Sequence, residues 1–188
     1  WRGQAVWAAA LLPGYWALMM LMPVPGHGAG DLGKEWNLAA YLDRALLGPA
    51  HMWRVAKVFD PEGILSTVPA VATALVGVLA GQWLRSGRAP AVLARGLAWA
   101  GVVGLAVGWL WGLVFPINKS LWTSSYVVFT AGWALVVLAF CYWLIDVRGV
   151  RRWGAPFVVF GVNALALYFL STLMAWLFVL FHLGEAGR

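Results

Sequence analysis

The sequence predicts an all-α integral membrane protein, a polytopic helical bundle with five spans and one short amphipathic helix outside them. Of its 188 residues, 63% are hydrophobic and only 11% are charged, and the mean hydropathy is +0.80. Soluble globular domains do not have this composition. A bilayer core of about 30 Å needs about 20 apolar residues in a helix. The stretches that meet this length are residues 4–22, 63–84, 92–114, 121–145 and 156–181. Lipid cannot pair a free backbone, so helices are expected throughout and strands are not.

A long segment, residues 23–62, separates the first two spans. Asn37 is expected to cap a short helix that ends at Gly48 and Pro49. One face of this helix would carry Leu38, Tyr41, Leu42, Ala45 and Leu46. It is too short to span, so it either lies on the membrane surface or folds over a cavity as a lid.

The second span is preceded by Asp60-Pro61-Glu62-Gly63. One interpretation is structural: Asp60 caps the helix, Pro61 is its first residue and Glu62 faces the helix dipole. The other interpretation is chemical, because two carboxylates at a membrane surface could hold an ammonium group of a substrate.

Small residues recur every four positions along the third span. They are Gly96, Ala100, Gly104, Gly108 and Gly112. Such a stripe lets helix backbones approach closely, and Thr73, Gly77 and Gly81 of the second span offer a counterpart. A gap for a slender ligand is the alternative.

The hairpin between the third and fourth spans, residues 116–126, is unusually polar for a membrane surface. It contains Asn118 and Lys119, and Trp122, Ser125 and Tyr126 follow at helical spacings of three and four, so several side chains could converge on one cavity. Alternatively, Lys119 extends to lipid phosphate.

Three further polar features are interpreted as structural rather than catalytic. Asn163 in the fifth span is expected to make an interhelical hydrogen bond. The lone Cys141 and the three histidines show no metal-ligand spacing, so no metal is expected. His51 is interpreted as a solvated interfacial side chain rather than a base.

Short basic loops orient the spans, because Lys and Arg in such loops stay on the cytoplasmic side. The loops carry Arg85, Arg88, Arg95, Arg148, Arg151 and Arg152. Parity then places residues 23–62, the 116–120 hairpin and the C-terminus outside. The net charge of +6 is explained by anionic membrane lipid as partner, and no nucleic acid is expected.

Taken in order, several blocks of the sequence resemble one family. They are Asn37-Leu38-Ala39-Ala40-Tyr41-Leu42-Asp43-Arg44, Asp60-Pro61-Glu62-Gly63-Ile64-Leu65-Ser66-Thr67, Gly77-Val78-Leu79-Ala80-Gly81, the 116–126 hairpin, Trp143-Leu144-Ile145-Asp146-Val147 and Phe160-Gly161-Val162-Asn163-Ala164. The chain resembles the C-terminal part of the membrane acyltransferases related to heparan-α-glucosaminide N-acetyltransferase, especially their bacterial homologues.

The resemblance implies transfer of an acetyl group from cytosolic acetyl-CoA, as co-substrate, to an amine or hydroxyl of a sugar or amino sugar outside the membrane. It implies catalytic roles for Asn118, Lys119 and Glu62, with Asn118 or Lys119 stabilising charge on the thioester carbonyl oxygen. The residues expected to bind the substrate are Asp60, Trp122, Ser125, Tyr126 and Asn163. A bacterial cytoplasmic (inner) membrane is the implied location.

One feature of the family pattern has no match here. The histidine expected as general base lies in earlier helices of the family, and His51 does not correspond to it. Because the chain also starts at Trp1 without Met, residues 1–188 are interpreted as a single transmembrane domain of a longer multi-span protein, an acyltransferase if those helices are present. The alternative is a non-catalytic membrane subunit that packs into a homo-oligomer or larger complex. A transporter ranks last, because few ionisable groups lie near mid-membrane.

Overall fold

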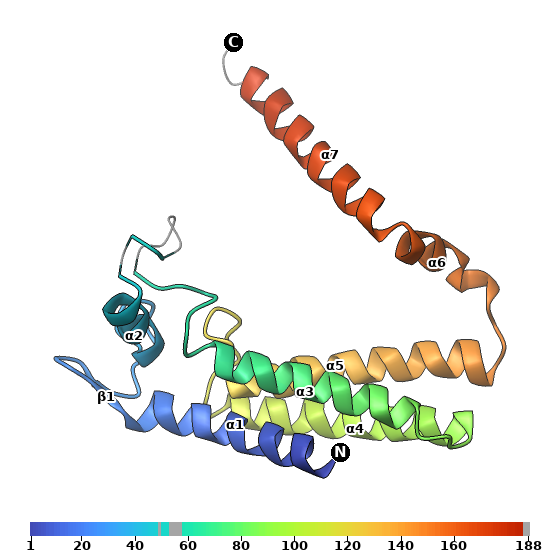
Figure 1. Cartoon of the computed structure of the whole chain (residues 1–188), viewed down its shortest axis with the longest axis horizontal. Helices are drawn as coiled ribbons and strands as arrows, with labels where there is room; N and C mark the ends of the chain where they lie inside the picture. Colours follow the sequence, from blue (N-terminus) through green and yellow to red (C-terminus); the bar gives the residue numbers. More distant parts are fainter. Residues whose placement is uncertain (49, 53–57, 186–188) are drawn as a thin grey trace. The chain divides into compact units, whose positions relative to one another are not determined.

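The computed structural model describes residues 1–48, 50–52 and 58–185, with side chains through residue 180. The chain divides into two compact units, Trp1–Trp143 and Leu144–Arg188, and each is described by itself (Figure 1).

Four long apolar helices run side by side in the first unit (Figure 1). They are α1 (Arg2–Leu21), α3 (Thr67–Leu84), α4 (Pro90–Gly112) and α5 (Ser124–Tyr142), and a π-helical turn (Trp143–Val147) follows α5. The most extensive packing joins α4 to α5, and α1 packs against α3. Each helix is long and apolar enough to cross a membrane. The all-α class and the first four spans are therefore confirmed, and the chain is an integral membrane protein.

The predicted short helix is also present, as α2 (Leu38–Leu46). Asn37 Oδ1 accepts a hydrogen bond of 2.8 Å from the Ala40 amide, and Gly48 follows the helix with φ of 74°, so cap and stop are confirmed. The predicted apolar face is partly wrong. Ala40 and Asp43 are buried beside Leu38, whereas Leu46 is 66% exposed, because only the first turns of α2 pack onto the bundle.

Two strands of two residues each depart from the prediction of no strands. β1 (Pro23–Val24) pairs antiparallel with β2 (Gly28–Ala29) just after α1. Gly26 and Gly28 take φ of 83° and 79°, a conformation that glycine adopts without strain and that a tight reversal requires. The strands lie in the loop that follows α1, where the constraint that demands helices inside lipid does not apply.

Two glycines of the predicted stripe, Gly104 and Gly108, pack on α5 together with Gly101, whereas Gly96 packs on Trp83 of α3, the helix that the sequence suggested as counterpart. A Cβ atom at Gly101, Gly104 or Gly108 would lie within 3.1 Å of α5 atoms, and α5 contributes Gly132 to the same contact. In contrast, a Cβ atom at Gly77 or Gly81 of α3 would have no neighbouring atom within 4 Å among the described residues of the first unit. Close packing is confirmed, with α5 as the main partner and Trp83 of α3 as the partner at Gly96.

This contact predicts a large effect of a side chain at Gly132. A Cβ there would lie 2.5 Å from the Leu105 nitrogen and 2.9 Å from the Gly101 oxygen, and backbone cannot move aside as a flexible side chain can. We expect Gly132→Val to lower stability by about 1–3 kcal/mol or more, measured as thermal unfolding in detergent. Gly77→Val is the matched control in α3, and equal losses for the two variants would contradict the packing described.

The second unit contains a 3-10 turn (Arg152–Gly154), α6 (Ala155–Val162) and α7 (Ala164–Glu185). The sequence predicted one span over 156–181, but these helices are bent by 77° at Asn163. The Asn163 side-chain Nδ2 donates to the Val159 carbonyl at 2.8 Å, within its own chain segment, and the expected hydrogen bond to another helix of the bundle stays a prediction. A side chain that competes for backbone carbonyls in this way favours a break. If the bent pair is one span, the described chain has five.

Candidate functional site

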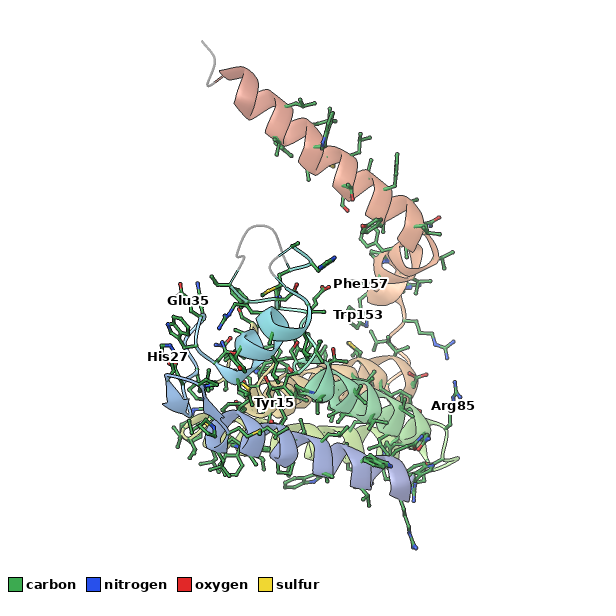
Figure 2. The ribbon with its side chains drawn as sticks, turned by 60° about the vertical axis from the view of Figure 1, so that its left-hand side comes forward. Tyr15, His27, Glu35, Arg85, Trp153 and Phe157 are labelled. Carbon is green, nitrogen blue, oxygen red and sulfur yellow. The ribbon has the colours of Figure 1, made fainter. Side chains whose placement is uncertain are left out.

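The polar segments of the first unit gather at one end of its bundle. We call this the loop end, and it comprises residues 23–48, 58–66 and 113–123. Figure 2 shows His27 and Glu35 near Tyr15 at this end, and Arg85 at the opposite end. A buried apolar cluster holds the loop end together; its members are Tyr15, Met19, Val24, Leu38, Ala39, Phe115 and Leu121. The described parts of residues 23–62 and the 116–120 hairpin, which charge and parity assigned to one side of the membrane, therefore lie at one end of the bundle, while the predicted side of the C-terminus stays a prediction.

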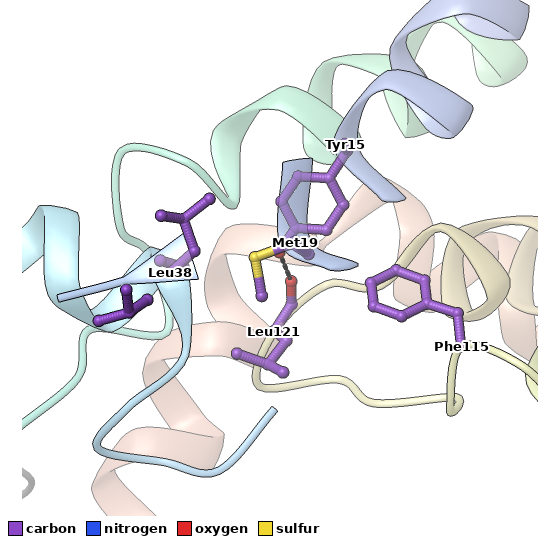
Figure 3. Close-up of a cluster of buried hydrophobic side chains, with 7 residues drawn as sticks. Tyr15, Met19, Leu38, Phe115 and Leu121 are labelled. Atoms are coloured by element: carbon purple, nitrogen blue, oxygen red, sulfur yellow. Dashed lines mark hydrogen bonds between the residues drawn. The ribbon is translucent and has the colours of Figure 1, made fainter. Parts of the chain in front are cut away.

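Tyr15 is the centre of that cluster. Its hydroxyl donates a 2.6 Å hydrogen bond to the Leu121 carbonyl, and its ring lies 6.2 Å from that of Phe115 (Figure 3). Because Leu38 of α2 packs into the same cluster, the end of α1, the helix α2 and the hairpin form one assembly.

The Asp60–Gly63 turn precedes α3 but does not start it, which corrects the capping interpretation. α3 begins at Thr67, and Asp60 Oδ1 accepts from the Glu62 amide at 2.9 Å. Asp60 therefore caps its own turn rather than a helix, and Glu62 lies five residues before the helix start. Glu62 is exposed and Asp60 is half-buried, so the Glu62 side chain is open to the surroundings of the loop end.

Asp43 is the acidic residue that sequence reasoning missed. It is 1% exposed, and its Oδ1 accepts from the Ile64 amide at 2.9 Å. Its Oδ2 is buried and has no hydrogen-bond partner among the described residues. A Cβ atom at Gly63 would lie 2.6 Å from the Asp43 Cγ, so only glycine fits against this carboxylate. The available signal was its position four residues after Ala39, on the face of α2 that packs inward.

The surroundings of Asp43 raise its pKa. Burial has the largest effect and the charge of Asp60 adds to it, whereas the Ile64 amide and the Arg44 guanidinium act in the opposite direction. Burial opposes the ionised form because it removes water from the carboxylate.

A pH-dependent stability follows from this shift. When the pKa is higher in the folded than in the unfolded state, the group is stabilising below the unfolded pKa of about 3.9. That contribution is lost as pH rises through the folded pKa, because the unfolded chain releases its proton more readily. Asp43→Asn has no ionisable group at this position and so lacks this pH-dependent loss of stability. We expect the thermal midpoint of the variant in detergent, relative to that of wild type, to increase as pH rises from about 4. A constant difference across pH would contradict the assignment.

The 116–123 hairpin is organised by Asn118 and Thr123. Asn118 Oδ1 accepts from the backbone amide of Ser120 at 2.8 Å, and the backbone amide of Asn118 donates to Thr123 Oγ1 at 3.0 Å. Thr123 Oγ1 in turn donates to the Pro116 carbonyl at 2.9 Å. Lys119 is exposed at the tip. These two hydrogen bonds of Asn118 use its backbone N–H and its Oδ1, and neither uses Nδ2 as donor. The side-chain amide can therefore accept from the turn through Oδ1 and donate to a ligand through Nδ2.

Trp122, near the end of the hairpin, connects the hairpin to α3, and Tyr126 packs against Trp122. Trp122, with φ of 50°, donates from Nε1 to Thr73 Oγ1 at 3.1 Å, and its ring lies edge-on to Tyr126 at 5.4 Å. Ser125 is buried and donates to the Phe115 carbonyl at 2.5 Å. The structure thus brings Trp122 and Tyr126 together, whereas Ser125 holds the end of α4.

Asn163 and two of the histidines belong to other segments of the chain. Asn163 belongs to the second unit, so its part in a site stays a prediction. His51 is exposed, with Nδ1 2.9 Å from the Leu47 carbonyl. His27 stacks on Trp36 with ring centroids 3.7 Å apart. Among the described residues, no group of three or more His, Cys, Asp or Glu could hold a metal ion.

Comparison with known proteins gives two clear relatives, while no family model matches the chain. Human heparan-alpha-glucosaminide N-acetyltransferase is 35% identical over 187 aligned residues, which cover 84% of this chain and 28% of the human protein. The mouse protein of the same name is 34% identical over 181 residues, covering 81% of this chain and 27% of its own length. The chain therefore spans under a third of the length of the curated relatives it matches.

Proposed function

Because the chain belongs to the family of the heparan-alpha-glucosaminide N-acetyltransferases, we propose that it forms part of a transmembrane acetyltransferase. The acetyl donor is acetyl-CoA on the cytoplasmic side, and the acceptor is an amine or hydroxyl of a sugar or amino sugar at the loop end. The observation that carries the proposal is the match to these relatives over most of the chain, together with the gathering of the 58–66 and 116–123 segments at one end of the bundle.

The acceptor is assigned to the Asp60–Gly63 turn. An exposed carboxylate at Glu62 and a half-buried one at Asp60 suit an ammonium or several hydroxyl groups, since charge-assisted hydrogen bonds are stronger than neutral ones. Trp122 and Tyr126 lie edge to face and offer an aromatic surface to a sugar ring. Ser125 and Asn163 complete the proposed substrate-binding set.

The acetyl group is assigned to the hairpin. When the acceptor nitrogen attacks the thioester carbonyl carbon, the carbonyl oxygen gains negative charge, the C–S bond breaks and coenzyme A leaves as thiolate. Asn118 Nδ2 or the Lys119 ammonium stabilises that oxygen, and such donors contribute most in a site that excludes water. The proton of the attacking amine goes to a base, which we assign to a part of the longer protein other than residues 1–188.

The cellular setting follows from the same proposal. The protein resides in a bacterial cytoplasmic membrane with its basic 85–89 loop toward the cytoplasm, where acetyl-CoA is present. The reaction needs no metal ion.

A non-catalytic membrane subunit is the second candidate. The specific observation in its favour is the face of α3 at Gly77 and Gly81, where no described residue of the first unit lies within 4 Å of a Cβ position. A smooth face of this kind fits a further helix closely, whether of the same protein or of a larger complex.

An acetyl-transfer assay separates the two candidates. Membranes that contain the natural full-length protein are supplied with labelled acetyl-CoA and a glucosamine-terminated acceptor. We expect labelled N-acetyl product at a rate that depends on both substrates. No product from membranes in which the protein is folded and abundant would overturn the enzyme and favour the subunit.

A further inference from the structure

The buried carboxylate of Asp43 on α2 faces the turn that carries Asp60 and Glu62. The contact is the hydrogen bond from the Ile64 amide to Asp43 Oδ1, which joins two residues 21 positions apart in the sequence. The next residue, Arg44, donates from Nη1 to the Val58 carbonyl at 2.6 Å. Two neighbouring side chains of α2 thus hold the turn from both sides, before Asp60 and after Glu62.

Several other contacts of the turn are local or apolar. Asp60 bonds the Glu62 amide within the turn, and Ser66 donates to the Gly63 carbonyl at 2.9 Å, three residues away. Leu65 packs against the apolar cluster of the loop end. The hydrogen bonds of Asp43 and Arg44 differ from these because they tie the segment that carries the acidic residues to α2.

The fit around Asp43 is tight and specific. Gly63 has no room for a side chain against this carboxylate, and within the described part of the chain the Asp43 Oδ2 atom has no hydrogen-bond partner. An unpaired buried oxygen is costly. For packing alone, an apolar residue at this position of α2 would serve better.

We propose that Asp43 is a positioning residue, which together with Arg44 clasps the 58–64 segment and fixes Asp60 and Glu62 for binding the acceptor. This inference rests on the proposed function. In it, Asp43 acts through the turn and does not touch the acceptor.

Hydrogen exchange tests the clasp without any assay of activity. In the natural full-length protein, Asp43→Ala removes the acceptor of the Ile64 amide, and we expect faster exchange in the peptide that contains residues 58–66. Asp31→Ala is the matched control, because Asp31 Oδ1 also accepts a backbone amide, that of Gly33 at 2.7 Å, in the same loop end but away from the turn. Unchanged exchange in Asp43→Ala would overturn the clasp.

Kinetics test what the clasp is for. We expect Asp43→Ala to raise KM for the acceptor about tenfold while KM for acetyl-CoA stays the same. Asp43→Asn keeps an oxygen for the Ile64 amide and has nearly the same shape, so it should restore KM to within about threefold of wild type. A purely structural role would change both KM values and the yield together.

The outcomes are distinct. If Asp43→Asn loses acceptor binding as fully as Asp43→Ala while exchange at 58–66 stays slow, the carboxylate itself contacts the acceptor and the positioning role is overturned. If the wild-type protein transfers no acetyl group, the proposed function fails and the acceptor role of the clasp fails with it. The exchange result still decides whether Asp43 holds the turn.

Discussion

Replacing Glu62 by Gln is expected to lower acetyl transfer to an amino-sugar acceptor by about 10- to 100-fold, because a charge-assisted hydrogen bond to the acceptor becomes a neutral one. Glu62 is exposed at the loop end, on a turn that Asp60 organises through the Glu62 amide. That bond uses backbone, so the substitution leaves the turn intact. The loss should be in kcat/KM for the acceptor, measured in membranes with saturating acetyl-CoA.

Glu35→Gln is the matched control for this experiment. Glu35 is a second exposed acid of the loop end, and removing its charge changes the local potential by the same amount without touching the Asp60–Gly63 turn. If the two variants lose activity equally, a general electrostatic effect of the outer segment explains the data and Glu62 has no specific contact.

Asn118→Asp is expected to lower kcat by about 100- to 1,000-fold, as the loss of one oxyanion donor does in other enzymes. The aspartate keeps an oxygen for the Ser120 amide, now bonded at 2.8 Å, so the hairpin should fold as before. It lacks the Nδ2 donor, and its negative charge opposes the charge that develops on the thioester oxygen.

Comparison with Asn118→Ala separates the two duties of this residue. The alanine variant loses the turn bonds to Ser120 and Leu121 and should also lower the thermal midpoint, whereas Asn118→Asp should not. Ser120→Ala, at an exposed position of the same turn, should behave like wild type. Full activity in Asn118→Asp would show that Asn118 stabilises the turn and has no catalytic role.

Features set by nearby residues were predictable from the sequence. Hydropathy over about 20 residues locates a span, and α1 and α4 lie within a few residues of the predicted ranges. Asn37 caps α2 through an amide only three residues away, which a local pattern can indicate.

Features set by distant contacts were not predictable in this way. The small residues of α4 indicate a close contact but not which helix makes it, and α5 supplies the opposing Gly132. The importance of Asp43 arises from an amide 21 residues away, so in sequence it reads as one more surface acid. The expected helix start at Asp60 was wrong. Asp60 bonds the Glu62 amide as a cap would, but the Ile64 amide is bonded to Asp43 Oδ1, and α3 begins only at Thr67.

The candidate site was nominated from local patterns, and its residues stay a prediction. Polar residues in two turns were enough to nominate Asp60, Glu62, Asn118 and Lys119, because such groups are costly near lipid unless something receives them. Their spacing could not show that Ser125 is turned to the Phe115 carbonyl. It also could not show that Trp122 bonds Thr73 on α3, because the fold brings these segments together.

The central claim is that the loop end receives an acetyl group that starts on the other side of the membrane. The direct measurement uses sealed vesicles of known orientation that contain the natural full-length protein, with Ser120→Cys labelled by an impermeant thiol reagent to identify the side of the hairpin. The account predicts product only when the acceptor is on the side of residue 120 and acetyl-CoA is on the side of the 85–89 loop. Product formed with both substrates confined to one side, and none when they are on opposite sides, would contradict it.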